Sequence, residues 1–219
     1  MSDTPDRFFI RRRTVLAAVL LGVAQPALAA RREPVVTILG DSITAGLGLP
    51  AAQALPAQLQ AALLRRGAPA RVRGAGVSGD TTADGLARLD FSVQPDTAVC
   101  VVALGGNDLL QGLEPGVVRA NLTAIVRRLR ARRIDVVLAG VRAPPVVGAG
   151  YARAFDAVFP AVARRQRVAL YPDLLSGVPP SLRQADGLHP SAAGVKVIAA
   201  GLAPLVARAL ATSGRRPPR

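Results

Sequence analysis

Short apolar runs alternate along the chain with longer segments whose apolar residues recur every three or four positions. An uninterrupted apolar run is typical of a strand covered on both faces, and the spaced pattern is typical of a helix with one buried face. We expect strands at residues 35–39, 71–75, 98–104, 135–141 and 168–171. Helices are expected at residues 54–66, 81–89, 115–133, 151–166 and 191–211.

The alternation of strands and helices predicts one α/β domain over residues 30–212, a three-layer α/β/α sandwich around a parallel sheet of about five strands. The helix at 115–133 shows the clearest pattern. Its buried face should carry Val118, Leu122, Ile125, Val126 and Leu129. Pro160 should break or kink the helix at 151–166 unless it falls near the first turn of a new helix. Residues 213–219 form a basic tail that we expect to be disordered.

The first 29 residues have the layout of an export signal. Arg11, Arg12 and Arg13 precede an apolar stretch at 15–23, and an Ala-x-Ala sequence ends at Ala29. We expect cleavage near Ala29 and a periplasmic or secreted protein. The adjacent arginines also resemble a twin-arginine signal. The alternative is an uncleaved membrane anchor, but the apolar stretch is shorter than the roughly 20 residues that a membrane span needs.

The chain is strongly basic, with a formal charge of +14 that comes almost entirely from arginine. Residues 1–29 contain four Arg and two Asp, so +12 remains on the rest of the chain. The arginines are spread over several expected helices and aromatic residues make up only 3%, so we expect no nucleic-acid interface. The charge fits a solvated surface, or one that makes peripheral contact with an anionic membrane.

The residue inventory restricts the chemistry. Cys100 is the only cysteine and lies in an apolar run, which indicates a buried small hydrophobe and no intramolecular disulfide. With one His and one Cys, a zinc site of the usual type cannot be built. Neither a Gly-x-x-x-x-Gly-Lys-Ser/Thr nor a Gly-x-Gly-x-x-Gly sequence follows the first strand. We expect no metal and no cofactor.

His189 is the only histidine and therefore the natural candidate for moving a proton near neutral pH. Asp186 precedes it by three residues, and Ser42 follows the first expected strand. A serine hydroxyl needs a base to become a nucleophile, and a carboxylate can orient that base. Each residue also has an ordinary structural role. Ser42 could cap a helix, Asn107 and Asp108 could lie in a turn, and His189 could be a surface residue.

Four short blocks give the chain a family resemblance. They lie at residues 40–46 (GDSITAG), 77–82 (VSGDTT), 105–108 (GGND) and 186–190 (DGLHP). In this order they resemble the conserved blocks of the GDSL, or SGNH, hydrolases, and most of all the exported multifunctional thioesterase, arylesterase and lysophospholipase branch. Gly74 and Gly76 depart from that branch, in which an asparagine and another small polar residue stand at these places.

The resemblance implies a flavodoxin-like fold and a serine hydrolase without a cofactor. Ser42 would be the nucleophile, His189 the base and Asp186 its orienting acid. The backbone N–H groups of Ser42 and Gly79 and the side-chain amide of Asn107 would form the oxyanion hole. Because glycine lacks a Cβ, Gly79 would let the backbone approach the substrate.

Four further residues are expected next to the substrate: Asp41, Asp108, Leu109 and Leu110. Asp41 and Asp80 are also expected to hold their loops by hydrogen bonds, and Asp108 is expected to be either structural or adjacent to the substrate. Together with Leu47 and Leu49, the leucines indicate that the bound group is an acyl chain or an aryl group.

We therefore expect an exported serine esterase that cleaves carboxylic esters or thioesters, such as aryl esters, lysophospholipids or acyl thioesters. The alternatives are an O-deacetylase of carbohydrate or peptidoglycan that uses the same residues, and a non-catalytic lipid-binding envelope protein.

Overall fold

The fold is described from a computed structural model of the chain, in which residues 1–2 and 33–214 are described. Residues 3–29 of the expected export signal and the tail residues 215–219 lie outside the described residues. Ser213, the first residue of the expected tail at 213–219, belongs to the last helix instead.

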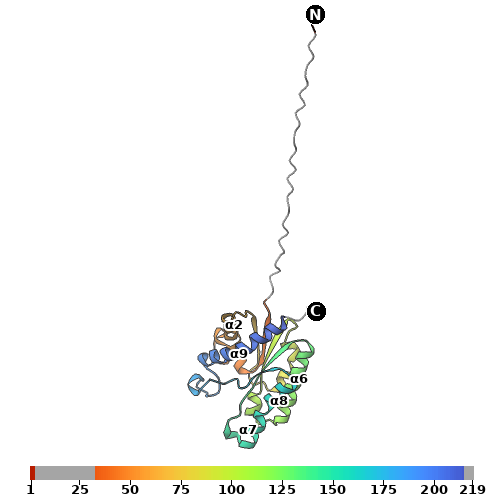
Figure 1. The fold of residues 1–219 in the computed structure, drawn as a ribbon. Coiled ribbons are helices and arrows are strands. Elements are labelled where there is room, and N and C mark those ends of the chain that lie inside the picture. Colours follow the sequence, from red (N-terminus) through yellow and green to blue (C-terminus); the bar gives the residue numbers. More distant parts are fainter. Residues whose placement is uncertain (3–32, 215–219) are drawn as a thin grey trace. The chain divides into compact units, whose positions relative to one another are not determined.

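The described residues form one five-stranded sheet in the order β2-β1-β3-β4-β5 (Figure 1). All neighbouring strands are parallel, which confirms the expected fold class. The strands are β1 (Val35–Gly40), β2 (Arg71–Gly76), β3 (Thr97–Ala103), β4 (Asp135–Ala139) and β5 (Ala169–Tyr171). β4 ends two residues earlier than expected, because the N–H of Gly140 donates to the Tyr171 carbonyl and its own carbonyl accepts from Leu174.

The helices of the described residues include all five expected ones. They are α1 (Ser42–Ala45), α2 (Leu55–Arg65), α3 (Thr82–Ala87), α4 (Leu89–Ser92), α5 (Gly106–Leu110), α6 (Pro115–Ala131), α7 (Ala149–Asp156), α8 (Val158–Gln166) and α9 (Ala192–Ser213). The expected helix at 151–166 divides into α7 and α8, and Pro160 falls in the first turn of α8, where its missing N–H costs nothing. α1, α4 and α5 were not predicted, since four or five residues are too few to show a helical period.

Two apolar cores lie on opposite faces of the sheet, one under α2 and α9 and the other under α6 and α8 (Figure 1). Successive residues of β3 face opposite cores: Val99 and Val101 face α9, and Cys100 and Val102 face α6. The five expected apolar positions of α6 are all fully buried. Cys100 is also fully buried, and this burial raises its pKa to about 12, so it is a packing residue.

Among the described residues, α9 is the one helix long and apolar enough to cross a membrane. Eight of its residues are buried, and it packs against α2 and against β3, β4 and β5. In this structure α9 is the central helix of one core.

The packing of α6 predicts a contrast between two leucines. Leu122 of α6 is fully buried, whereas Leu64 of α2 is 65% exposed. We expect Leu122→Ala to lower the free energy of unfolding by about 2–5 kcal/mol, because it leaves a cavity. Leu64→Ala should change it by less than about 0.5 kcal/mol. Urea unfolding of both variants checks this, and equal effects would contradict the placement of α6.

Candidate active site

Ser42 stands two residues after the end of β1, at the edge of the sheet where all five strands end. It is the first residue of α1, and the preceding residue, Asp41, caps this helix by accepting a hydrogen bond from the N–H of Ile43 at 3.0 Å. Asp41, and not Ser42, therefore caps α1, so helix capping does not explain Ser42. Its side chain is free to face the sheet edge, and its own N–H has no partner within the helix.

A chain of two short hydrogen bonds joins Ser42 to His189 and Asp186. Ser42 Oγ lies 2.8 Å from His189 Nε2, although the residues are 147 positions apart. His189 Nδ1 lies 2.6 Å from Asp186 Oδ2. The structure therefore brings together the three residues that the sequence predicted as nucleophile, base and orienting acid.

The turn at residues 186–189 holds the carboxylate in place. Asp186 Oδ1 accepts from the backbone N–H groups of Leu188 and His189 at 2.9 and 3.0 Å, and Gly187 has a φ of 71° that favours glycine. The hydrogen bond from His189 and these two N–H groups lower the pKa of Asp186 to about 2. The ionised Asp186 accepts a hydrogen bond from the N–H at Nδ1 of His189. Nε2 then carries no proton and can accept a hydrogen bond from the Ser42 hydroxyl.

Gln184 attaches this turn to the loop after α1. Its side-chain amide donates to the carbonyls of Leu47 at 2.9 Å and Pro190 at 3.1 Å, and its backbone N–H donates to the His189 carbonyl at 2.7 Å. Gln184 thus joins the segment that carries the imidazole to the segment that carries the hydroxyl. The sequence analysis did not identify it, since a single Gln in a loop gives no pattern.

Gly79 and Asn107 lie on the two neighbouring segments of the same edge. Gly79 has a φ of 90°, while a Cβ built on it would meet no atom within 4 Å. Within the described residues, the backbone conformation alone favours glycine there, and the expected approach of a substrate to this backbone stays a prediction. Asn107 Nδ2 donates to the Asp80 carbonyl at 2.9 Å, which orients the amide and leaves its second N–H for another partner.

Arg88 binds three of the segments that form this edge. Its guanidinium donates to the carbonyls of Gly40 at 2.8 Å and Ala75 at 3.0 Å, at the ends of β1 and β2. It also pairs with Asp80 at 2.5 Å, and both side chains are largely buried. Because Asp80 in turn accepts from Asn107, Arg88 supports the Gly79–Asp80 loop and the amide together. The sequence analysis missed this role, because Arg88 is one of many arginines.

The aspartates expected beside the substrate differ in their surroundings. Asp108 is fully buried, and its two oxygens accept from the N–H of Thr82 at 2.8 Å and from its hydroxyl at 2.6 Å. It holds the start of α3 and does not face solvent, so the structure gives it a supporting position and not a substrate-facing one. Asp41 is 5% exposed beside Ser42, and desolvation by this burial raises its pKa to about 6.

The leucines near the site divide into two kinds. Leu49 and Leu109 are half-buried and pack against the two cores. Leu47 and Leu110 are exposed at the sheet edge. Only the second pair is open to a bound molecule without rearrangement.

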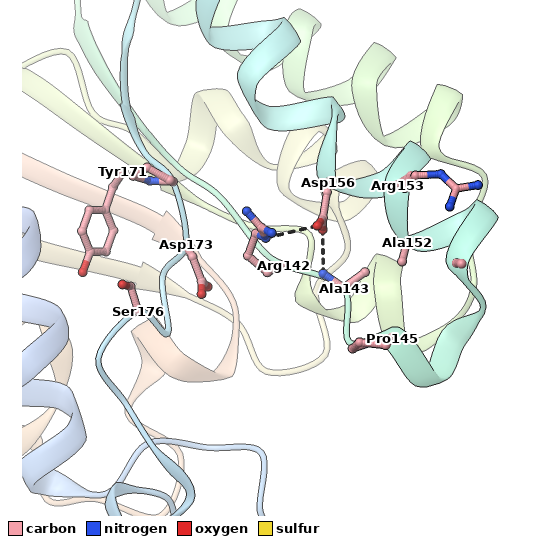
Figure 2. A pocket seen from close by; sticks show the side chains of 11 residues that line it. Arg142, Ala143, Pro145, Ala152, Arg153, Asp156, Tyr171, Asp173 and Ser176 are labelled. Carbon is pink, nitrogen blue, oxygen red and sulfur yellow. Dashed lines mark hydrogen bonds and ion pairs between the residues drawn. The ribbon is translucent and has the colours of Figure 1, made fainter.

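An open cleft of about 740 Å³ lies further along the same edge, past the ends of β4 and β5 (Figure 2). Arg142 pairs there with Asp156 at 3.1 Å, and Asp156 also accepts from the N–H of Ala143 at 2.8 Å. Tyr171 and Asp173 line the opposite side (Figure 2). Among the described residues, no three His, Cys, Asp or Glu side chains lie close enough together to hold a metal ion.

Comparison with known proteins gives consistent matches across the domain. The sequence profile of the GDSL-like Lipase/Acylhydrolase family matches residues 38–197. "Esterase TesA" of Pseudomonas aeruginosa is 42% identical over 159 residues, which cover 71% of this chain and 79% of that protein. "Thioesterase 1/protease 1/lysophospholipase L1" of Escherichia coli (strain K12) is 36% identical over 157 residues, covering 70% and 74%. The solved crystal structure of TesA matches with a TM-score of 0.75 and 38% identity, over 80% of this chain and 99% of that one.

The raised pKa of Asp41 predicts a pH-dependent stability. The pKa of Asp41 rises from its ordinary value of 3.8 to about 6 in the folded protein, so the folded state holds this proton more tightly than the unfolded chain does. The free energy of unfolding should therefore fall as pH rises through that window. Asp41→Asn keeps a capping oxygen but does not titrate. Between pH 4 and pH 7 we expect its free energy of unfolding to rise by up to about 3 kcal/mol relative to that of the original protein.

Urea unfolding of both proteins across this range measures the difference. The lowered pKa of Asp186 acts at more acid pH and is common to both, so it cancels in the comparison. Parallel stability curves for the two proteins would contradict the environment described for Asp41.

Proposed function

Because the chain belongs to the GDSL-like lipase/acylhydrolase family and is a serine ester hydrolase, we propose that it works through an acyl-enzyme formed on Ser42. The observation that carries this proposal is the hydrogen-bonded chain Ser42–His189–Asp186, with its distances of 2.8 and 2.6 Å. A hydroxyl within reach of an oriented imidazole is the arrangement that nucleophilic catalysis by serine needs.

In the first half of the reaction, Ser42 Oγ attacks the carbonyl carbon while His189 Nε2 takes the hydroxyl proton. Asp186 stabilises the resulting imidazolium. The bond between the carbonyl carbon and the leaving oxygen or sulfur then breaks, and the imidazolium gives its proton to the departing alcohol or thiol. The acyl group remains on Ser42.

In the second half, a water molecule attacks the acyl carbon and His189 takes one of its protons. The bond to Ser42 Oγ breaks, the serine recovers its proton from the imidazolium, and the carboxylic acid leaves. The base and the nucleophile return to their starting protonation states.

Negative charge develops on the carbonyl oxygen in both halves, and three donors are proposed to receive it. The N–H of Ser42 is available at the start of α1, Gly79 presents its N–H from a loop held by Arg88, and Asn107 keeps one amide N–H after donating to Asp80. Donors that are already oriented stabilise this charge without reorganisation during the reaction.

We propose esters and thioesters of acyl chains or aryl groups as substrates, including lysophospholipids. The exposed Leu47 and Leu110 at the edge support an apolar bound group. The names of the relatives, an esterase and a thioesterase/lysophospholipase, point to the same class. Export to the periplasm or beyond is proposed from residues 1–29 alone.

The proposal predicts that Ser42→Ala lowers kcat on p-nitrophenyl esters by at least about 10⁴-fold, because within residues 33–214 Ser42 supplies the hydroxyl that is hydrogen-bonded to His189. The matched control is Ser176→Ala, which removes an exposed hydroxyl from the same edge of the sheet. Steady-state assays on folded proteins check both. Retained turnover in Ser42→Ala would remove Ser42 from the mechanism, and activity confined to acetyl groups on glycans would favour a deacetylase.

A second prediction concerns the oxyanion donors. Asn107→Ala should lower kcat by about 10²–10³-fold with a smaller change in KM, since the donor acts mainly on the transition state. The other asparagine, Asn121, donates to Thr82 behind α3 at 3.1 Å, and Asn121→Ala should leave kcat nearly unchanged. If the two variants lost equal activity, Asn107 would be a structural residue.

A further inference from the structure

Exposed apolar side chains gather on segments at the edge of the sheet that carries the candidate site. Among residues 33–214, nine large apolar side chains are exposed, and six of them lie on segments at the edge of the sheet that carries Ser42. We define the apolar rim as these six: Leu47, Val77, Leu110, Val146, Val147 and Leu188. The other three lie on helices α2, α4 and α6.

The rim residues come from segments far apart in the sequence that the parallel sheet brings to one edge. Leu188 is next to His189, Val77 lies two residues before Gly79, and Leu110 lies three residues after Asn107. Leu47 belongs to the loop that Gln184 attaches to the His189 segment. Four of the six rim residues therefore lie on the segments that carry the residues proposed to react with the ester, and Val146 and Val147 lie on the segment after β4 at the same edge.

We propose that the apolar rim docks onto a lipid surface, from which the site takes its acyl ester. This inference rests on the proposed function. Exposed apolar side chains that gather at one place mark an interaction site, whereas those scattered singly do not. The most prominent is Val146, which is 89% exposed on the loop between β4 and α7.

The charge of the chain fits a membrane containing anionic lipid. Outside residues 1–29 the formal charge is +12, which attracts the protein to such a surface. Beside the loop that carries Pro145, Arg142 and Arg153 lie in the same cleft as Asp156 and Asp173 (Figure 2). Arg142 pairs with Asp156, but its side chain is 64% exposed, and long basic side chains at the border of an inserted apolar surface can reach the headgroups.

A second copy of the chain is a poorer occupant of this surface. The rim residues lie on separate segments of the sheet edge that carries Ser42 and His189, and a protein partner seated on all of these segments would cover the site. A fluid lipid layer adapts to separate apolar side chains and can also supply the substrate.

The test uses the full chain carrying Ser42→Ala, so that lipid is not consumed. Val146→Asp/Val147→Asp is compared with Leu64→Asp/Phe91→Asp, which changes side chains that are 65% and 85% exposed on α2 and α4. Binding is measured by co-sedimentation with vesicles of equal parts phosphatidylglycerol and phosphatidylcholine. We expect the rim variant to bind about tenfold more weakly, since two apolar side chains no longer insert, and the control to bind like the parent.

Val146→Trp in the same background should bind more tightly, which gives a second readout if the double variant does not fold. Vesicles of phosphatidylcholine alone separate insertion of the rim from attraction by charge. A parent protein that binds neither vesicle, or equal losses in the rim and control variants, would overturn the proposal. So would a parent dimer that the rim variant converts to a monomer.

Turnover of p-nitrophenyl acetate, a soluble ester, separates this proposal from the proposed function. With Ser42 intact, Val146→Asp/Val147→Asp should hydrolyse it at the original rate and lose activity on micellar lysophosphatidylcholine. If the original protein hydrolyses the acetate but its Ser42→Ala form does not bind vesicles, the docking proposal alone is contradicted. Absence of acetate turnover from the parent would sink the proposed function, while vesicle binding would still be measurable.

Discussion

The parallel direction of all five strands is the constraint on which the site depends. A parallel sheet needs cover on both faces, and here α2 and α9 cover one face while α6 and α8 cover the other. The ends of the strands are then the places where polar groups from distant segments can meet without burial in a core. The contact between Ser42 and His189, which spans 147 positions of sequence, follows from this arrangement.

Side chains that do not touch the expected substrate keep these segments in register. Arg88 joins the ends of β1 and β2 to Asp80, Asp108 holds the start of α3, and Gln184 joins the His189 turn to the loop after α1. A partly buried ion pair such as Arg88–Asp80 adds little to stability compared with an apolar pair, but losing one partner strands the other. We infer that its value to the protein lies in fixing geometry at the sheet edge.

The sequence predicted the parts of the fold that carry a long repeating pattern. Strands β1, β3 and β4 and the buried face of α6 could be predicted because apolar runs and helical spacing directly reflect burial. The short strands β2 and β5 were also predicted, although none of their residues is buried. The short helix α1 could not, although it presents Ser42, since four residues show no period. The sequence left a structural and a substrate-adjacent role open for Asp108, because a carboxylate that accepts from Thr82 and one that faces a ligand look the same in a motif.

The proposed mechanism requires that His189 makes Ser42 reactive, and covalent labelling tests this requirement most directly. The protein would be treated with an ethyl phosphonate ester bearing a p-nitrophenyl leaving group and digested, and the labelled peptide would be identified by mass spectrometry. We expect one adduct, on Ser42, and much slower labelling in His189→Ala. An adduct on another serine such as Ser78, or labelling at an unchanged rate without the imidazole, would contradict it.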